Sequence, residues 1–234
     1  MPTLIRRCLV KREKGGGRIS RWFMPEIARL SGNSDWIDLD FVERQRTPEA
    51  AMKLAIQMHL AGLSLSNTIS VVEKLGVQRS RKAVHDWVQK ADLQPTSGKA
   101  PNQVAVDETV IRINGEQYWL YAAADPQTND LLHLRLFSTT TTALTEIFLR
   151  ELRQKNNVDD AVFLVDGATH LHAALHRAGL RFQYERSGNR NSVERIFREV
   201  KRRTSSFSNC FSHVEPETAE NWLQSFARWH NGPN

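Results

Sequence analysis

Apolar residues recur at helical spacing through residues 47–91, and this pattern predicts three short helices. The first is expected to start with Thr47 as its N-cap and to end at Gly62. The second starts at about Ser66, and the third starts near Ser80 after a glycine turn. Two helices, a turn and a third helix form a helix-turn-helix, so we predict a small all-α domain in this segment.

The polar side of the third predicted helix would face outward. It carries long hydrogen-bond donors that suit phosphates and the base edges of a major groove: Arg79, Arg81, Lys82, His85 and Gln89. This favours DNA binding by residues 47–91. A plain helical hairpin with a solvated polar face would show the same pattern, and that alternative stays open.

Residues 92–102 combine Pro, Gly, Ser and polar residues without periodicity, which is typical of a linker. Beyond it, residues 103–113 alternate apolar and polar positions. Asn114-Gly115 then predicts a hairpin turn into a second strand over residues 117–124. The chain therefore changes from helices to strands at this linker.

The rest of the chain predicts one more strand followed by alternating helices and strands. The expected elements are a strand at 131–137, a helix at 142–155, a strand at 161–165, a helix at 170–178, a strand at 182–184 and a helix at 191–203. This is the order of an α/β ribonuclease-H-like mixed sheet with flanking helices, which we assign to residues 103–234. Many α/β domains share the order.

Charge is distributed unevenly along the 234 residues, whose formal net charge is +6. Residues 1–100 hold 17 Lys and Arg against 10 Asp and Glu, whereas residues 101–234 hold 15 against 16. Residues 1–46 include a basic, glycine-rich stretch and are predicted to form an N-terminal arm without an assigned role. No stretch is apolar enough for a membrane helix. Cys8 and Cys210 lie far from each other and from any His pair at the spacing of metal ligands, so neither a disulfide framework nor a zinc site is predicted. We expect a cytoplasmic, nucleoid-associated protein that binds neither a membrane nor a small-molecule cofactor.

Three acidic residues occupy positions where acids are unexpected on structural grounds. Asp107 lies in the first predicted strand, where Asp is a poor strand former. Asp166 ends the apolar strand 161–165, at the edge where open α/β sheets place ligands. Glu194 lies in the last predicted helix, between its apolar and basic faces. In a ribonuclease-H-like sheet the two Asp strands are neighbours, so all three carboxylates are expected to reach one cleft.

Three carboxylates in one cleft repel one another unless hard divalent cations neutralise them. We therefore predict a site for two Mg²⁺ or Mn²⁺ ions, which would activate the attacking oxygen and stabilise the leaving oxygen of a phosphodiester. Each acid also has a simpler interpretation: Asp166 as a turn former, Asp107 or its neighbour Glu108 as a solvent-facing strand residue, and Glu194 with Asn191 as a capping box.

Basic residues follow Glu194 on the last predicted helix. Residues 177–203 hold nine basic side chains and three acidic ones. The cations that lie on or beside the stripe of Glu194 are Arg198, Lys201, Arg202 and Arg203. A bound phosphate backbone would favour this stripe, although an Arg at i+4 simply pairs with its Glu on many surface helices.

Three segments resemble the Asp-Asp-Glu signature of insertion-sequence transposases, and the closest likeness is to the IS6-type family, particularly its archaeal members. The segments are Val104–Thr109, Phe163–Gly167 and Arg190–Thr204, and the likeness covers about residues 45–234. The 27 residues between Asp166 and Glu194 are fewer than in typical bacterial members.

The resemblance implies that Asp107, Asp166 and Glu194 bind the catalytic metals and that Lys201 contacts DNA near the cleaved strand. It implies an enzyme that recognises terminal inverted repeats, exposes 3′-hydroxyls and joins them to target DNA by transesterification. Pairing of two DNA ends implies a homodimer or a higher oligomer. Two other hypotheses stay open: a catalytically inactive or domesticated DNA-binding protein derived from a transposase, and a ribonuclease-H-like nuclease acting on structured DNA.

Overall fold

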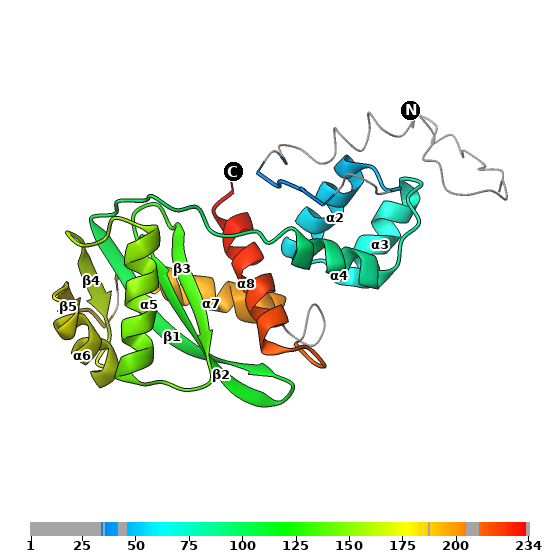
Figure 1. Cartoon of the computed structure of the whole chain (residues 1–234). Helices are drawn as coiled ribbons and strands as arrows, with labels where there is room; N and C mark the ends of the chain where they lie inside the picture. Colours follow the sequence, from blue (N-terminus) through cyan, green and yellow to red (C-terminus); the bar gives the residue numbers. More distant parts are fainter. Residues whose placement is uncertain (1–33, 35, 42–45, 187, 205–210, 233–234) are drawn as a thin grey trace, which may run out of the picture.

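The computed structural model describes residues 34, 36–41, 46–186, 188–204 and 211–232. Most of the predicted basic arm lies outside these residues. The described elements, in chain order, are α2 (Glu49–Leu60), α3 (Leu65–Lys74), α4 (Arg81–Lys90), β1 (Gln103–Ile113), β2 (Glu116–Ala124), β3 (Leu131–Phe137), α5 (Thr142–Lys155), β4 (Val162–Val165), α6 (Thr169–Arg177), β5 (Arg181–Tyr184), α7 (Asn191–Arg203) and α8 (Pro216–His230). Figure 1 shows the three N-terminal helices beside the sheet, with α8 between them.

The five strands form one mixed sheet in the order β3-β2-β1-β4-β5. β1, β2 and β3 are an antiparallel meander, whereas β4 and β5 run parallel to β1. This topology is ribonuclease-H-like, and the predicted fold class is confirmed. The strand that bears Asp107 is at the centre of the sheet, and the strand that ends at Asp166 is its neighbour.

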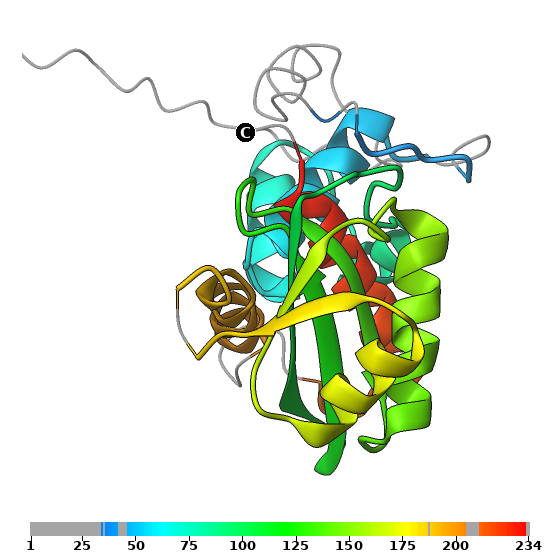
Figure 2. The ribbon, with the colours of Figure 1, turned by 90° about the vertical axis from the view of Figure 1, so that its left-hand side faces the viewer.

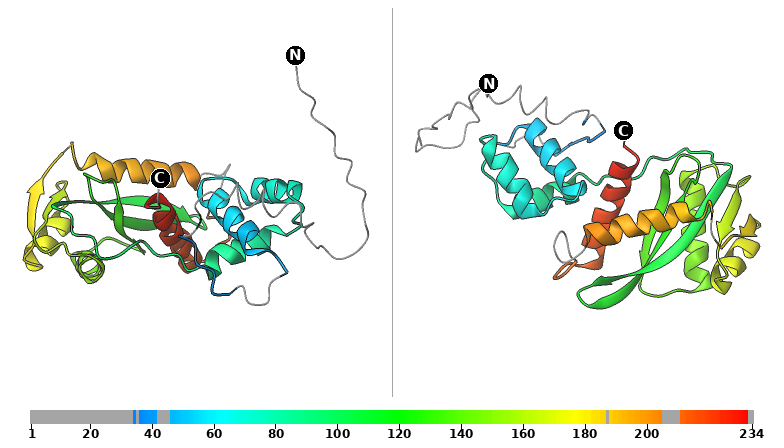
Figure 3. Two further views of the ribbon diagram at one scale, coloured as in Figure 1. Left: turned by 90° about the horizontal axis from the view of Figure 1, so that it is seen from above. Right: turned by 180° about the vertical axis from the view of Figure 1, so that it is seen from behind.

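Helices cover both faces of the sheet, because the strands alternate apolar residues toward two separate cores. Val106 and Phe163 belong to the core under α5 and α6. Ala105 and Ile111 belong to the core that includes α7, α8 and the N-terminal helices. Figures 2 and 3 show α5 and α7 on opposite sides of the sheet. The face of the sheet to which a strand side chain points therefore decides which helices it contacts.

Helix α8 is not among the elements predicted from the sequence pattern. It begins with Pro216 at its first turn and covers the free edge of β3. Its side chains pair with backbone groups of that edge strand: Gln224 with the oxygen of Leu134, Glu220 with the amide of Leu136, and Asn231 with both groups of Leu131. An exposed edge strand invites pairing with other chains, and α8 closes this one.

The three N-terminal helices form at the predicted places, with one difference at the start of α2. The N-cap is Pro48, without a side-chain cap bond, so the predicted capping by Thr47 is wrong. The hydroxyl of Thr47 is buried and instead accepts a hydrogen bond of 2.6 Å from Nε of Arg79. These helices share a hydrophobic core with α8, through residues such as Trp87 and Trp222. No helix in the described part of the chain is long and apolar enough to cross a membrane.

Candidate active site

The carboxylates of β1 and β4 lie at the same level of the sheet. Ala105 pairs with Leu164 in the parallel register, so Asp107 and Asp166 are each two residues further on. Asp107 is 9% exposed, and its Oδ1 accepts a hydrogen bond from the amide of Glu108. Oδ1 of Asp166 accepts from the amide of Ala168 at 2.9 Å, so Asp166 does form the predicted turn. The turn brings Asp166 to the end of β4 beside Asp107 rather than away from it.

Arg190 joins the first and third predicted acids. Its Nη1 lies 2.6 Å from Oδ2 of Asp107, and its Nη2 lies 2.5 Å from Oε1 of Glu194. The Arg190 side chain is 9% exposed and precedes α7 directly. Glu194 is thus held toward β1 by this ion pair. The capping-box interpretation of Glu194 is wrong, because α7 has no side-chain cap bond.

Burial and neighbouring negative charges raise the pKa values of the two acids of β1. Burial raises the pKa of Asp107 to about 6, against the opposing effects of the Arg190 charge and the Glu108 amide, and the Asp166 and Glu194 charges raise it further. Burial also raises the pKa of Glu108 to about 7, and the charges of Asp107 and Asp166 add to this. One guanidinium does not offset these carboxylates, so the site favours an additional cation.

Glu108 points to the opposite face of the sheet from Asp107. It pairs in register with Tyr121, and its Oε1 lies 3.2 Å from Nε2 of His170 on α6. Burial lowers the pKa of His170 and raises that of Glu108, so this contact is not a strong ion pair at neutral pH. Neither acid of β1 faces solvent, and the prediction that one of them does is wrong: the Glu108 side chain is 11% exposed.

The three predicted acids do not form a closed ligand cluster. Among the described residues, no group of three or more His, Cys, Asp or Glu is close enough to hold a metal ion. The Arg190 guanidinium instead lies between the carboxylates of Asp107 and Glu194. The structure therefore brings two of the acids to one cation and places Asp166 within electrostatic reach of them.

The basic residues of α7 divide into an exposed set and a buried one. Lys201 is exposed, and its Nζ donates to Oγ1 of Thr109 on β1 at 2.6 Å, two residues beyond Asp107. Arg198 and Arg202 are exposed as well, and Arg202 lies 3.9 Å from Glu199. This places Lys201 beside the strand that carries the first candidate acid.

Arg203 is buried, and the prediction that it binds DNA is wrong. It is 4% exposed and donates to the backbone oxygen of Leu60 at 2.8 Å and to Oε1 of Glu199 at 2.7 Å. Its guanidinium lies 4.3 Å from the ring centroid of Trp229. It also fills the space beside Gly62, whose φ of +115° suits glycine and where a Cβ would lie 2.9 Å from Nη1. Arg203 therefore ties α2 to α7 and α8.

Several polar side chains of the predicted recognition helix α4 contact other residues of the same chain. Arg81 and Lys82 are exposed, and Lys82 pairs with Asp86 at 3.1 Å. His85 is half-buried and lies 3.5 Å from the same carboxylate. Gln89 donates to the backbone oxygen of Thr218 at 3.2 Å, so it faces α8 rather than outward as expected. A cavity of about 260 Å³ lies at this junction of α4 and α8.

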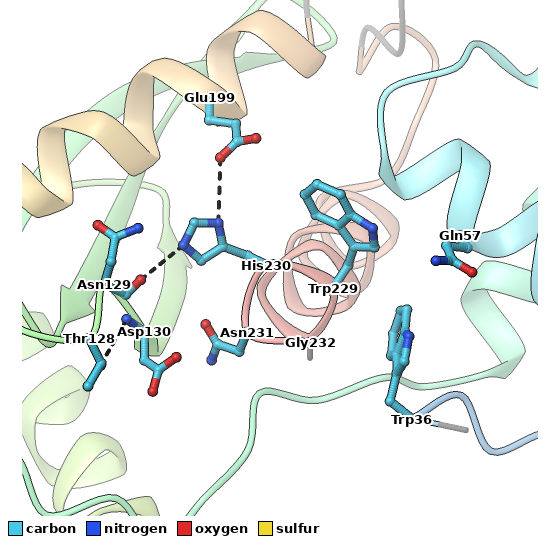
Figure 4. A pocket seen from close by; sticks show the side chains of 10 residues that line it. All are labelled: Trp36, Gln57, Thr128, Asn129, Asp130, Glu199, Trp229, His230, Asn231 and Gly232. Carbon is cyan, nitrogen blue, oxygen red and sulfur yellow. Dashed lines mark hydrogen bonds and ion pairs between the residues drawn. The ribbon is translucent and has the colours of Figure 1, made fainter. Parts of the chain in front are cut away.

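A second cavity, of about 430 Å³, lies between α7, α8 and the turn before β3 (Figure 4). His230 contacts the backbone oxygen of Asn129 at 3.0 Å and the carboxylate of Glu199 at 3.5 Å. Trp36 and Gln57 lie across the cavity, and Asp130 is paired with Lys99. Asp130 and Glu199, the acids that line this cavity, already pair with basic side chains of the chain. We therefore interpret the cavity as a packing junction between these elements and not as a ligand site.

A family model described as a DDE domain, of the IS240 transposase type, matches residues 102–231. The chain belongs to the DDE transposases of insertion sequences. The matched region begins one residue before β1 and ends one residue after α8, so it contains the whole sheet and the candidate site. The predicted family is confirmed, whereas the roles of individual residues stay predictions.

Known proteins similar to this transposase include an uncharacterized archaeal protein, MJ0017 of Methanocaldococcus jannaschii. It is 27% identical over 199 residues, covering 83% of this chain and 92% of its own length. Among solved structures, the catalytic core of BIV integrase is 12% identical, with a TM-score of 0.43, covering 58% of this chain and 87% of its own. The HTLV-2 integrase core in complex with magnesium (trimeric form) is 10% identical, with a TM-score of 0.37, covering 55% and 85%.

Proposed function

We propose that this chain is the transposase of an insertion sequence, which cuts the terminal inverted repeats of its element and joins them to target DNA. Asp107, Asp166 and Glu194 hold one or two Mg²⁺ or Mn²⁺ ions for this reaction. The observation that carries the proposal is the bridge from Arg190 to both Asp107 and Glu194, level with Asp166. The Arg190 guanidinium lies between two of the acids, where this proposal requires a metal cation.

The donor set fits hard divalent cations in its chemistry. All three acids offer carboxylate oxygens, the ligands that Mg²⁺ and Mn²⁺ prefer. Burial raises the pKa of Asp107, the charges of Asp166 and Glu194 add to this, and added positive charge opposes both effects. A divalent ion bound here would supply the charge that stabilises the attacking and leaving oxygens of phosphodiester transfer. Arg190 must release at least one carboxylate before such an ion binds, because its guanidinium bridges two of the three.

The residues of α7 hold the DNA backbone beside the acids. Lys201 lies on the Asp107 side of β1, where its ammonium group can bind a phosphate next to the reacting one. Arg198 and Arg202 extend the positive surface along the same helix. The 3′-hydroxyl oxygen attacks phosphorus as the bond to the leaving 3′-oxygen breaks, so no covalent enzyme intermediate forms.

The N-terminal helices read the terminal repeat in this proposal. Residues 47–91 act as the helix-turn-helix domain, joined by residues 92–102 to the catalytic domain at 103–234. Arg81, Lys82 and His85 of α4 reach phosphates and base edges. Arg79 supports the start of α4 through Thr47. Two DNA ends require two such readers, so the active species is a homodimer or a higher oligomer.

The proposal is tested with DNA taken from both sides of the gene. Purified protein is incubated with these fragments and a target plasmid, with Mn²⁺, Mg²⁺ or EDTA. Metal-dependent cutting at inverted repeats and joined products are expected. Specific binding without any cutting would favour the DNA-binding protein without catalysis, and cutting of branched junctions alone would favour the nuclease.

A further inference from the structure

Strand β5 forms an open edge of the sheet. It is the last strand in the order β3-β2-β1-β4-β5, and all four of its residues are exposed. Figure 2 shows β5 in yellow on the side of the molecule that faces the viewer. At the other edge, side chains of α8 bond to the backbone of β3 and cover it. An open edge is a template for pairing with another strand, so β5 is the edge of this sheet that a second chain can extend.

The backbone groups of Phe182 and Tyr184 point away from the sheet. The amide of Glu185 donates to the backbone oxygen of Val165 on β4 at 3.0 Å. Successive residues of a strand turn their N–H and C=O groups to opposite sides, so the groups of Gln183 and Glu185 face β4. Those of Phe182 and Tyr184 therefore face the open edge. No side chain in the described part of the chain bonds to them.

The two faces of β5 carry different side chains. Phe182 and Tyr184 pair in register with residues of β4 that belong to the core under α5 and α6, so they lie on that face of the sheet. They are 36% and 57% exposed, and they are the large hydrophobic residues exposed in the described part of the chain. Arg181, Gln183 and Glu185 alternate with them and lie on the opposite face. The open edge therefore offers an aromatic face and a charged face.

The order of these side chains complements itself when a second copy runs antiparallel. In the register that places Gln183 opposite its own counterpart, Phe182 lies opposite Tyr184. In the same register Arg181 lies opposite Glu185. Ring meets ring on one face and arginine meets carboxylate on the other, and two-fold symmetry repeats each pair. The outward backbone groups also meet, because an aromatic pair of this kind exchanges two hydrogen bonds.

The two charges of this edge have no charged partner inside one copy. Nη2 of Arg181 donates to the backbone oxygen of Asp160, which is neutral. Oε1 of Glu185 accepts from the backbone amide of Asn189 at 2.6 Å, which is also neutral. Within the described residues, neither Arg181 nor Glu185 forms an ion pair. Charge complementarity therefore favours a second copy of this chain as the occupant of the edge.

We propose that two copies of this chain pair antiparallel along β5, with Gln183 at the two-fold axis, and join their sheets into one. The covered edge at β3 cannot accept a further copy, so the assembly closes at two chains instead of growing into a filament. Opposite residues of an antiparallel pair point to the same face, so the Asp107 sites of both copies open on one side of the joined sheet. This pairing does not rest on the proposed function, although it suits a protein that holds two DNA ends.

The register is tested by crosslinking the full chain, with Cys8 and Cys210 replaced by Ser. Opposite residues of a non-hydrogen-bonded antiparallel pair have Cα atoms about 4.5 Å apart, which suits a disulfide. Gln183→Cys is therefore expected to form a disulfide-linked dimer on mild oxidation. Arg181→Cys is the matched control, because this register puts its counterpart about 14 Å away, and it should stay reduced. A mixture of the Arg181→Cys and Glu185→Cys proteins should link.

The association is measured by sedimentation velocity over a series of protein concentrations, without DNA or metal. A strand of four residues gives a small interface, so the wild type is expected to dimerise weakly and in proportion to concentration. Arg181→Glu and Glu185→Arg each place like charges opposite one another and should raise the dissociation constant at least about tenfold. The double variant restores opposite charges and should regain the wild-type dimer, although it lacks the contacts with Asp160 and Asn189.

A chain that stays monomeric at every concentration, with no disulfide in Gln183→Cys, would overturn the proposal. A dimer that neither charge reversal weakens would lie on another surface and would overturn it as well. Equal crosslinking of Gln183→Cys and Arg181→Cys would show that the register is wrong. The proposed function fails separately, if metal-dependent cutting persists in a variant that lacks all three acids.

Discussion

The guanidinium of Arg190 lies 2.6 Å from Oδ2 of Asp107, and both side chains are almost completely buried. The second nitrogen of the same guanidinium holds Glu194 at 2.5 Å. This single cation compensates two carboxylates that come from the central strand and from α7. A divalent ion and Arg190 therefore compete for the same oxygens.

The first prediction concerns the Arg190→Ala variant. Without metal, it leaves the buried carboxylate of Asp107 unpaired, so the free energy of unfolding should fall by about 3 kcal/mol. When Mn²⁺ is added, the variant has no guanidinium that competes for the carboxylates. The metal-induced rise in its melting temperature should therefore exceed that of the wild type. Thermal unfolding with and without Mn²⁺ measures both effects.

The matched control for this prediction is Arg186→Ala, because Arg186 is exposed and lies in the loop before α7. It should leave both the metal-free stability and the response to Mn²⁺ unchanged. If Arg190→Ala responds to Mn²⁺ less than the wild type does, Arg190 helps to build the metal site rather than competing for it.

The second prediction concerns the two kinds of arginine on α7. Arg203→Ala removes buried hydrogen bonds to α2 and Glu199 and a cation–π contact, so it should cost at least about 2 kcal/mol of stability. Arg198→Ala, on the exposed side of the same helix, should leave the stability within about 0.5 kcal/mol. Urea unfolding of the two variants makes the comparison, and equal stabilities would contradict the structural role of Arg203.

The third prediction concerns DNA binding by Lys201. Lys201→Ala should weaken binding uniformly across DNA sequences and reduce the slope of log affinity against log salt by about 1, because one phosphate contact is lost. Affinities measured over a series of salt concentrations test this. A change confined to one DNA sequence would show that Lys201 contacts a base instead.

The fourth prediction is a pH dependence of stability from His59. Burial lowers its pKa to about 4, with the charge of His85 adding to this and the hydrogen bond to Leu63 opposing it. The folded pKa lies below the unfolded value, so the unfolded state binds more protons between these two values. Stability from His59 is therefore present above about pH 6.5 and is lost as the pH falls toward 4. At pH 5 the loss should be about 2 kcal/mol.

His59→Gln keeps a hydrogen-bond donor for Leu63 but does not titrate. The difference in unfolding free energy between the wild type and this variant should therefore shrink as the pH falls from 7 to 5. A difference that is constant over this range would contradict the burial of a neutral His59.

The periodicity of the sequence predicted most of the elements, because strands and helices of this sheet alternate between two faces that each bury apolar side chains. The ribonuclease-H-like fold assigned from the order of these elements predicted that the strands of Asp107 and Asp166 are neighbours, and the alternative interpretation of Asp166 predicted its turn. No prediction covered α8, although Trp222, Leu223 and Phe226 recur at helical spacing after Pro216. The predicted metal ligands stay predictions.

The sequence pattern did not single out Arg190, and it grouped the buried Arg203 with the exposed cations of α7. Arg190 and Arg203 each lie three residues from an apolar contact position, Val193 and Val200. Each arginine therefore lies beside the apolar stripe of α7, and the two occupy opposite margins of it. Charge alone could not separate them from Arg198, because the burial of an arginine depends on partners that lie far away in the sequence.

The adjacent acids of β1 offer the most direct test of the central claim, because Asp107 faces α7 and Glu108 faces α6. The measurement is Mn²⁺-dependent cutting of the element's ends by Asp107→Asn and by Glu108→Gln, with Mn²⁺ affinity measured by calorimetry on the same samples. Asp107→Asn should reduce cutting by at least about a thousandfold and weaken Mn²⁺ binding, as expected for the loss of a catalytic metal ligand. Glu108→Gln should retain both. Full activity in Asp107→Asn, or its loss in Glu108→Gln alone, would contradict the assignment of the site.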